Sequence, residues 1–154
     1  MLITADCVGW GGTAYSPRAA EADGGRALTD LDRVMEMSDA FRLYGLERQA
    51  LDDLQNLCDR LDGEFRAEGI ASGFTRRDSL LFTADPADGE LLEAEYLARR
   101  RVFPECALLR RRTASDAFSF DIHAGILTRE GGAALDPYAL THLCLMKAER
   151  LGAS

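Results

Sequence analysis

Carboxylates are the side chains best placed to do chemistry in this chain, and they gather between residues 29 and 68. This segment carries eleven acidic side chains and five arginines. At 100° per residue, the carboxylates fall on helical faces that point away from the leucines. The first face holds Asp32, Glu36 and Asp39, and the second holds Asp52, Asp59 and Asp62. We interpret both faces as a surface that binds a basic partner, and a merely solvated helix face is the alternative.

Arginines supply nearly all of the positive charge and cluster in residues 99–112, which hold six arginines and one glutamate. Glu95 and Arg99 stand four residues apart, a spacing at which side chains on a helix can pair. We expect an anion site or an interface ion-pair cluster formed by Arg99, Arg100, Arg101, Arg110, Arg112 and His123. The structural alternative is that these cations stabilise a helix C-terminus and protect the edge of a sheet.

Residues that suit catalysis or metal binding are few. Asp121 and His123 alternate along a predicted strand, so a carboxylate and an imidazole share one face and could exchange a proton. No serine or cysteine partner for them follows from spacing. His142 and Cys144 are two residues apart on a predicted helix and point in different directions, so we expect no metal site there.

A glycine-rich stretch at residues 9–12 surrounds Trp10. Its glycines lack the spacing of dinucleotide-binding or triphosphate-binding loops, so we expect no phosphate loop and no cofactor. Trp10 is either a packing anchor or an exposed contact, and its surroundings in the sequence leave both readings open.

Length and charge bound the class of protein. The 154 residues suit one domain, residues 1–154, with a core of ordinary size. A net charge of −8 argues against a general nucleic-acid binder, which needs a basic surface to displace counterions from phosphates. We expect no membrane span and no signal peptide, and therefore a cytoplasmic protein. Reduced core cysteines are expected at Cys7, Cys58, Cys106 and Cys144.

The N-terminal half predicts a strand and two helices. Residues 2–8 form a short apolar strand, and residues 9–27 form a loop. Thr29 is a favourable N-cap for a first helix, which Gly45 interrupts. A second helix runs over residues 46–67 with one apolar side. That side consists of Leu46, Ala50, Leu54, Leu57, Cys58, Leu61 and Phe65.

Two further helices carry the same start signal, an aspartate followed by a proline. Asp85-Pro86 suits the cap and first position of a helix that ends near Val102. Asp136-Pro137 repeats the signal for a last helix that runs to about Leu151. The expected packing residues of the last helix are Ala139, Leu140, Leu143, Cys144 and Met146.

Three stretches predict strands. Residues 79–84 resemble a buried strand, because their centre is apolar. Residues 117–127 alternate between apolar and polar side chains more clearly than any other stretch. Residues 106–113 are the expected hairpin partner, with Leu109 opposite Phe120 on the buried face. The alternating apolar residues are Phe118, Phe120, Ile122, Ala124 and Ile126.

These patterns predict an α+β fold, with a small, mainly antiparallel sheet and about four helices packed on or beside it. The predicted function is that of a non-enzymatic acidic protein that occupies a basic surface of a macromolecular partner. Its most specific form is an inhibitor of a nucleic-acid-handling complex, of the anti-CRISPR or anti-restriction type, whose carboxylates mimic the phosphates of DNA. The excess of arginine over lysine indicates a GC-rich coding sequence, typical of a bacterium or a mobile genetic element.

Two other functions stay open. One is an immunity protein or chaperone that covers a basic toxin or effector, and the other is a small enzyme that uses His123 with nearby aspartates and arginines. We also expect a homodimer, because the strand at residues 117–127 needs a neighbour at its edge unless residues 80–82 supply it. Residues 99–101 of one copy could also meet the acidic helices of the other, which would use both charge clusters.

Overall fold

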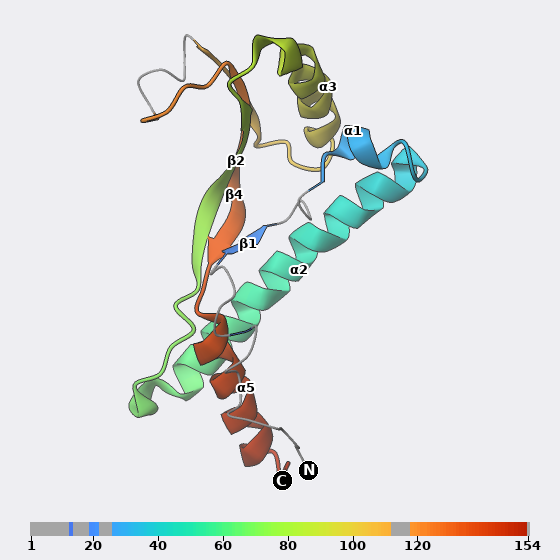
Figure 1. Ribbon diagram of the computed structural model, residues 1–154. Helices are drawn as coiled ribbons and strands as arrows, with labels where there is room; N and C mark the ends of the chain where they lie inside the picture. Colours follow the sequence, from blue (N-terminus) through green and yellow to red (C-terminus); the bar gives the residue numbers. More distant parts are fainter. Residues whose placement is uncertain (1–12, 14–18, 22–25, 112–117, 154) are drawn as a thin grey trace. The chain divides into compact units, whose positions relative to one another are not determined.

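A computed structural model describes residues 13, 19–21, 26–111 and 118–153 (Figure 1). The described helices are α1 (Leu28–Leu31), α2 (Met37–Glu64), α3 (Gly89–Arg99) and α5 (Pro137–Arg150), with 3-10 helices at Arg66–Glu68 and Pro86–Asp88. The described strands are β1 (Ala19–Glu21), β2 (Thr75–Thr83), β3 (Ala107–Arg110) and β4 (Ala124–Ala134). They form one antiparallel sheet in the order β1-β4-β2, and β3 also pairs with β4.

The predicted α+β class is confirmed. The predicted strand at residues 2–8, Cys7 and Trp10 lie outside the described residues. No helix in the described stretches is both long enough and apolar enough to cross a lipid bilayer.

The chain divides into two compact units, each built from separate segments. We call residues 51–76 and 133–153, with 13 and 19–20, the α5 unit. Residues 21, 26–50, 77–111 and 118–132 form the α3 unit. The expectation of a single domain stays a prediction.

A small apolar core holds the α5 unit together. Leu61, Phe65 and Leu143 are buried in it, and partly buried side chains surround them. Helix α5 begins as predicted, because the carboxylate of Asp136 accepts hydrogen bonds from the N–H groups of Tyr138 and Ala139 at 3.0 and 3.1 Å. The surrounding side chains are Leu57, Ile70, Leu140 and Met146.

The core of the α3 unit forms around Tyr44, which is fully buried. Its ring meets the ring of Phe103 edge-on, with centroids 6.2 Å apart. Arg48 fixes the loop after α3, because its guanidinium donates to the carbonyl of Val102 at 3.0 Å and pairs with Glu105 at 3.1 Å. Part of the apolar side predicted for α2 is not buried, since Leu46 is 55% exposed.

The start of α2 differs from the prediction. Thr29 is not an N-cap; its N–H and hydroxyl donate to the carboxylate of Glu95, and α1 ends at Leu31. The chain then turns, and α2 runs from Met37 straight through Gly45. A glycine inside a helix costs about 1 kcal/mol relative to alanine. Burial of Tyr44 beside it outweighs that cost, because a buried aromatic ring is worth more.

The hairpin forms, but its register differs from the prediction. Strand β4 begins at Ala124, and Leu109 lies opposite Gly125 instead of Phe120. The alternation of Phe118 and Phe120 reflects an aromatic cluster, since their rings are 5.5 Å apart and the Phe120 ring lies 4.8 Å from that of Phe82. Gly125 permits β2 to approach, because a Cβ there would lie 3.3 Å from the carbonyl oxygen of Leu81.

The edge of β4 is already covered within the chain. Strands β1 and β2 flank β4, and β3 pairs with residues 124–127. Residues 80–82 of β2 therefore supply the neighbour that a second copy was expected to provide. The argument for a homodimer through this edge is wrong.

Two of the predicted core cysteines are buried, and the third described one is not. Burial raises the pKa of the thiols of Cys58 and Cys106. Cys144 was expected to pack but is exposed, because it lies about 100° around α5 from the buried Leu143.

This difference predicts selective labelling. Iodoacetamide should modify Cys144 in the folded protein and should reach Cys58 and Cys106 only after unfolding, because the reactive species is an accessible thiolate. Peptide mass spectrometry after brief labelling checks this. Equal labelling of Cys58 and Cys144 in the folded protein would show that the α5 unit does not pack as described.

Candidate functional site

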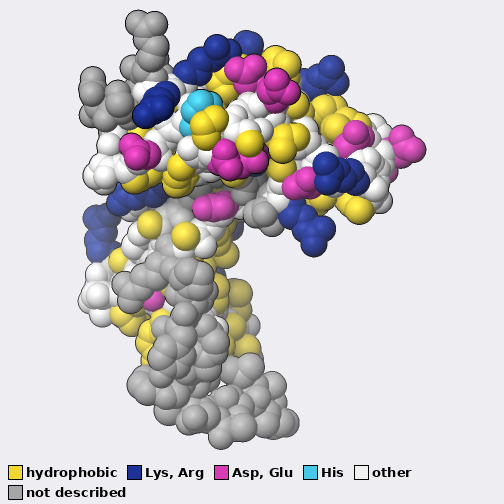
Figure 2. Space-filling view, turned by 45° about the horizontal axis from the view of Figure 1, so that its top comes forward, with side chains coloured by type: hydrophobic (Ala, Val, Ile, Leu, Met, Phe, Trp, Pro, Cys, Tyr) yellow, Lys and Arg dark blue, Asp and Glu magenta, His cyan; other side chains and the backbone are white. Residues whose placement is uncertain are grey.

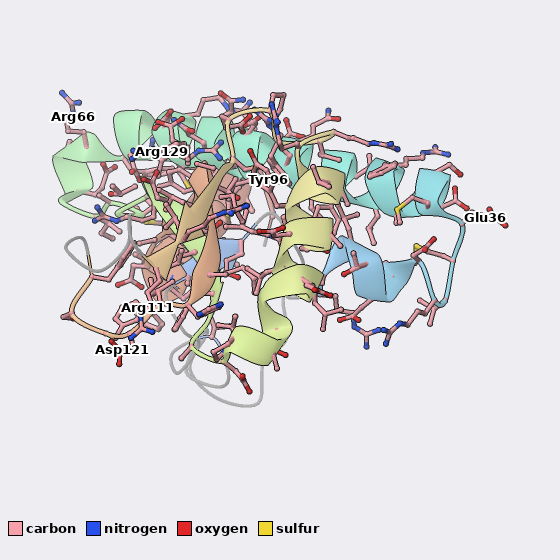
Figure 3. All side chains as sticks on the ribbon, turned by 90° about the horizontal axis from the view of Figure 1, so that it is seen from above. Glu36, Arg66, Tyr96, Arg111, Asp121 and Arg129 are labelled. Carbon is pink, nitrogen blue, oxygen red and sulfur yellow. The ribbon has the colours of Figure 1, made fainter. Side chains whose placement is uncertain are left out.

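A group of exposed carboxylates lies in residues 30–39, which we call the acidic turn. Asp32, Glu36 and Asp39 are all exposed, as predicted. None of the three forms an ion pair with a lysine or arginine in the described part of the chain. The side chain of Glu36 projects outward from the turn between α1 and α2 (Figure 3).

A turn, and not one helical face, brings these carboxylates together. Asp32 is the C-cap of α1, Glu36 precedes α2, and Asp39 lies in the first turn of α2. The carbonyl of Glu36 accepts the N–H groups of Asp39 and Ala40 at 2.9 and 3.1 Å. Val34, which lies between Asp32 and Glu36 in the sequence, has 68% of its surface exposed. Arg33 beside it is also exposed and lies 3.8 Å from the carboxylate of Asp30.

The second predicted acidic face belongs to the α5 unit, and two of its three carboxylates form an ion pair or hydrogen bonds within the chain. Asp59 is exposed, but Asp52 pairs with Arg76. Asp62 is only half-exposed, and its carboxylate accepts the N–H of Ser72 at 2.7 Å and the Ser72 hydroxyl at 2.8 Å. The prediction that Asp62 is a free surface carboxylate is wrong, because the sequence holds no sign of a hydrogen-bond partner ten residues away.

The predicted arginine cluster is distributed over separate contacts. Arg99 is buried against Glu95, and Arg110 pairs with the exposed Glu93 at 2.8 Å. The guanidinium groups of Arg100 and Arg101 lie over the rings of Tyr96 and Phe41 at 5.6 and 5.4 Å. Arg112 lies outside the described residues. The described members are thus bound to different neighbours and do not converge on one anion site.

Glu95 is a buried charged residue of the α3 unit whose carboxylate accepts hydrogen bonds from three other residues. Its side chain and that of Arg99 are each 3% exposed, and they pair at 2.6 Å, as their spacing predicts. One oxygen of Glu95 also accepts the N–H of Leu28 at 3.0 Å, and the other accepts the N–H and hydroxyl of Thr29 at 2.9 and 3.0 Å. Sequence reasoning missed these bonds, since nothing local links residues 66 or more positions apart.

The proposed acid/base pair of Asp121 and His123 loses its geometric basis. Both residues precede β4, so the alternation of a strand does not place them on one face. The N–H of His123 donates to the carbonyl of Thr83 at 2.8 Å, and the imidazole lies against Gly89. Within the described residues, no three His, Cys, Asp or Glu side chains form a group that could hold a metal ion.

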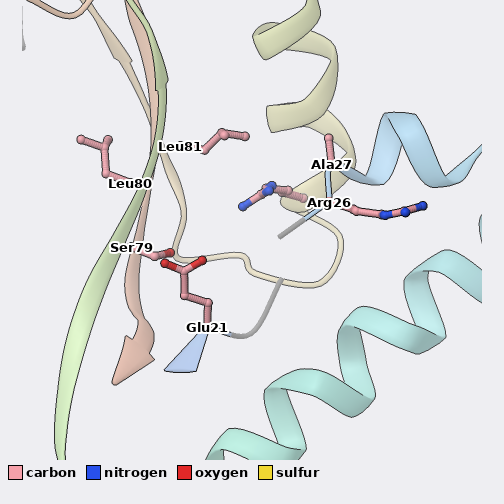
Figure 4. Close-up of a pocket in the computed structure, with 7 residues that line it drawn as sticks. Glu21, Arg26, Ala27, Ser79, Leu80 and Leu81 are labelled. Atoms are coloured by element: carbon pink, nitrogen blue, oxygen red, sulfur yellow. The ribbon is translucent and has the colours of Figure 1, made fainter. Parts of the chain in front are cut away.

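Two hollows open in the α3 unit. The smaller, of about 130 Å³, is shown in Figure 4, where Glu21 and Ser79 approach one another and Arg26 points away from them. The larger, of about 290 Å³, lies between α1, β2 and α3, with Phe82 and Leu91 in its wall. The surface of this unit mixes acidic, basic and hydrophobic side chains (Figure 2). Neither hollow assembles a recognisable catalytic pair.

No protein-family model and no curated protein matches the chain. Among solved structures, the fold is similar to glycine oxidase from Geobacillus kaustophilus, with a TM-score of 0.71 and 16% identity, over 95% of this chain and 36% of that one. L-proline dehydrogenase from P. horikoshii matches with a TM-score of 0.49 and 14% identity, over 70% of this chain and 28% of that one. The chain spans about a third of the length of glycine oxidase. At this identity the likeness defines the fold alone.

Proposed function

We propose that this protein is a non-enzymatic binding protein whose acidic turn docks on a basic surface of a macromolecular partner. The observation that supports the proposal best is the exposure of Asp32, Glu36 and Asp39, none of them paired with a cation in the described residues. Charges left in water add little to the stability of the protein itself. They attract an oppositely charged partner and speed its encounter.

The exposed Val34 offers an apolar contact within the same turn. Interfaces bind through a desolvated apolar centre with a polar rim, and Val34 with its carboxylate neighbours has that composition. A partner surface that complements the acidic turn has basic side chains around a small apolar pocket. In the most specific form of the proposal, that surface belongs to a nucleic-acid-handling complex, and the carboxylates occupy positions of phosphates. A basic toxin or effector is the alternative partner.

Affinity capture from the native host tests the proposal. The bait is the full chain, and the test variant changes Asp32, Glu36 and Asp39 to lysine. A matched control changes Asp53, Glu90 and Glu149 to lysine, which are also exposed and alter the net charge equally. We expect the wild type and the control to capture the same partner and the test variant to lose it.

The outcomes separate the possibilities. A nuclease complex held through the acidic turn supports an inhibitor, and a toxin held in the same way supports an immunity protein or chaperone. Equal capture by wild type and test variant would mean that the interface lies elsewhere. Equal loss in both variants would mean that overall charge, and not this surface, governs binding.

A role within an oxidoreductase is a second candidate, favoured by the similarity of fold to part of glycine oxidase. The rest of such an enzyme would have to come from outside these 154 residues, because about two thirds of glycine oxidase has no counterpart here. Oxygen uptake with glycine, measured on protein purified from the native host, tests it. Turnover that His123→Ala abolishes would favour the small enzyme, and no oxygen uptake by the wild type argues against the oxidoreductase role.

A further inference from the structure

The hollow between α1, β2 and α3 combines apolar and acidic side chains in its wall. Phe82 and Leu91 form part of the apolar wall and keep 43% and 62% of their surfaces exposed. The ring of Phe82 packs against that of Phe120, with centroids 4.8 Å apart, which fixes its position. The volume of about 290 Å³ lies at the lower end of the range for small-ligand sites, about 300–1,000 Å³. The hollow therefore suits a ligand of about the size of one side chain.

Two exposed carboxylates in the wall are open to a cation. The hydroxyl of Thr83 donates to one oxygen of Asp88 at 3.0 Å, and Asp88 forms no ion pair with a lysine or arginine among the described residues. Asp30 lies 3.8 Å from the guanidinium of Arg33, which is longer than the 2.7–3.2 Å of an N–H···O hydrogen bond. An incoming cation thus meets one unpaired carboxylate and one that is only weakly paired.

The charge of the wall as a whole is negative. Glu95 also lines the hollow, but Arg99 balances its charge through the buried pair at 2.6 Å. The remaining charges of the wall are Asp30 and Asp88 against Arg33. Because Arg33 is exposed and loosely held, a cation from outside can replace it beside Asp30.

An arginine side chain matches both parts of this wall. Its aliphatic stem packs on apolar surface, and its planar guanidinium stacks on an aromatic ring and donates to carboxylates. Arginine is also among the residues that most often anchor an interface from within a pocket. We propose that this hollow binds an arginine side chain, which the partner supplies when it docks on the acidic turn. The inference rests on the proposed function, since Asp30 and Arg33 belong both to the acidic turn and to the wall.

A titration followed by nuclear magnetic resonance tests the hollow without the partner. The probes are N-acetylarginine amide and N-acetylcitrulline amide, a neutral analogue of the same shape, added to the isotope-labelled full chain. We expect the arginine probe to shift the amide signals of Thr83, Asp88 and Leu91, with a dissociation constant of about 1–10 millimolar for so small a ligand. The citrulline probe should bind at least about fivefold more weakly, because it carries no charge. No shift of these signals by the arginine probe, or equal binding of the two probes, overturns the proposal.

Two variants with opposite expected effects test the charges of the wall. Asp88→Asn should weaken binding of the arginine probe at least about fivefold, and Asp53→Asn, an exposed aspartate of the α5 unit, is the matched control. Arg33→Ala should strengthen binding at least about twofold, because it removes the competing cation beside Asp30. An Asp88→Asn variant that binds like the control, or an Arg33→Ala variant that binds more weakly than the wild type, contradicts the inference.

The probe titration and the affinity capture fail separately. If the acidic-turn variant loses the partner but the arginine probe does not bind, the hollow is not an arginine site and the proposed function stands. If the arginine probe binds as expected but the acidic-turn variant captures the partner as well as the wild type does, the hollow is an arginine site and the proposed function is wrong.

Discussion

Replacing Glu95 with alanine is expected to lower the free energy of unfolding by about 3–5 kcal/mol, the usual cost of removing one partner of a buried ion pair. Arg99 would keep a buried charge without its carboxylate, because only 3% of its side chain reaches solvent. The N–H groups of Leu28 and Thr29 would also lose their acceptor. The change therefore releases α1 from α3 as well as breaking the pair.

Urea denaturation followed by circular dichroism measures the effect. Glu93→Ala is the matched control, because Glu93 lies on the same helix as Glu95 but at the surface. Its ion pair with Arg110 of β3 is exposed, and an exposed pair is worth about 1 kcal/mol or less. If Glu95→Ala does not fold, Thr29→Val removes only one hydroxyl bond and should cost about 1 kcal/mol. Equal urea midpoints of unfolding for the Glu95 and Glu93 variants would show that Glu95 does not stabilise the α3 unit as described.

Asp62→Ala is expected to destabilise the protein by about 2–4 kcal/mol, since hydrogen bonds to a charged group are worth about 1.5–3 kcal/mol each and do not add fully. Ser72 is completely buried and donates both its N–H and its hydroxyl to Asp62. The carbonyl of Ser72 accepts the N–H of Asp136 at 2.7 Å, so the loop before β2 and the cap of α5 depend on the same residue.

Asp59→Ala serves as the control for Asp62→Ala. Asp59 is an exposed aspartate on the same helix, and its loss should change stability by no more than about 0.5 kcal/mol. Thermal and urea unfolding of both variants give the comparison. Should Asp62→Ala retain full stability and instead lose the partner, Asp62 would be the binding residue that the sequence had indicated.

Features fixed by neighbouring residues could be predicted from the sequence. Asp136-Pro137 starts α5 as expected, and Asp85 caps the 3-10 helix that leads into α3 by accepting the N–H of Ala87 at 2.9 Å. The Glu95–Arg99 pair follows from a spacing of four residues. In each case the interaction lies within one helical turn, so the local sequence contains both partners.

Features fixed by distant partners could not be predicted. Thr29 resembles an N-cap, but the carboxylate of Glu95 takes its N–H and hydroxyl. Phe118 and Phe120 alternate as in a strand, but both precede β4, and their rings cluster with Phe82 of β2. The exposure of Asp32, Glu36 and Asp39 was predicted correctly, although they do not share one helix: Asp32 ends α1, Glu36 lies in the turn, and Asp39 begins α2.

The affinity of the captured partner at two salt concentrations tests the acidic turn most directly. Isothermal calorimetry on the wild type should show at least about a tenfold loss between low and high salt, because screening shortens the reach of surface charges to below about 8 Å above physiological ionic strength. The lysine variant of Asp32, Glu36 and Asp39 should bind at least about tenfold more weakly even at low salt. The control variant of Asp53, Glu90 and Glu149 should bind within about threefold of the wild type. Equal affinities for the wild type and the acidic-turn variant at both salt concentrations would contradict the account.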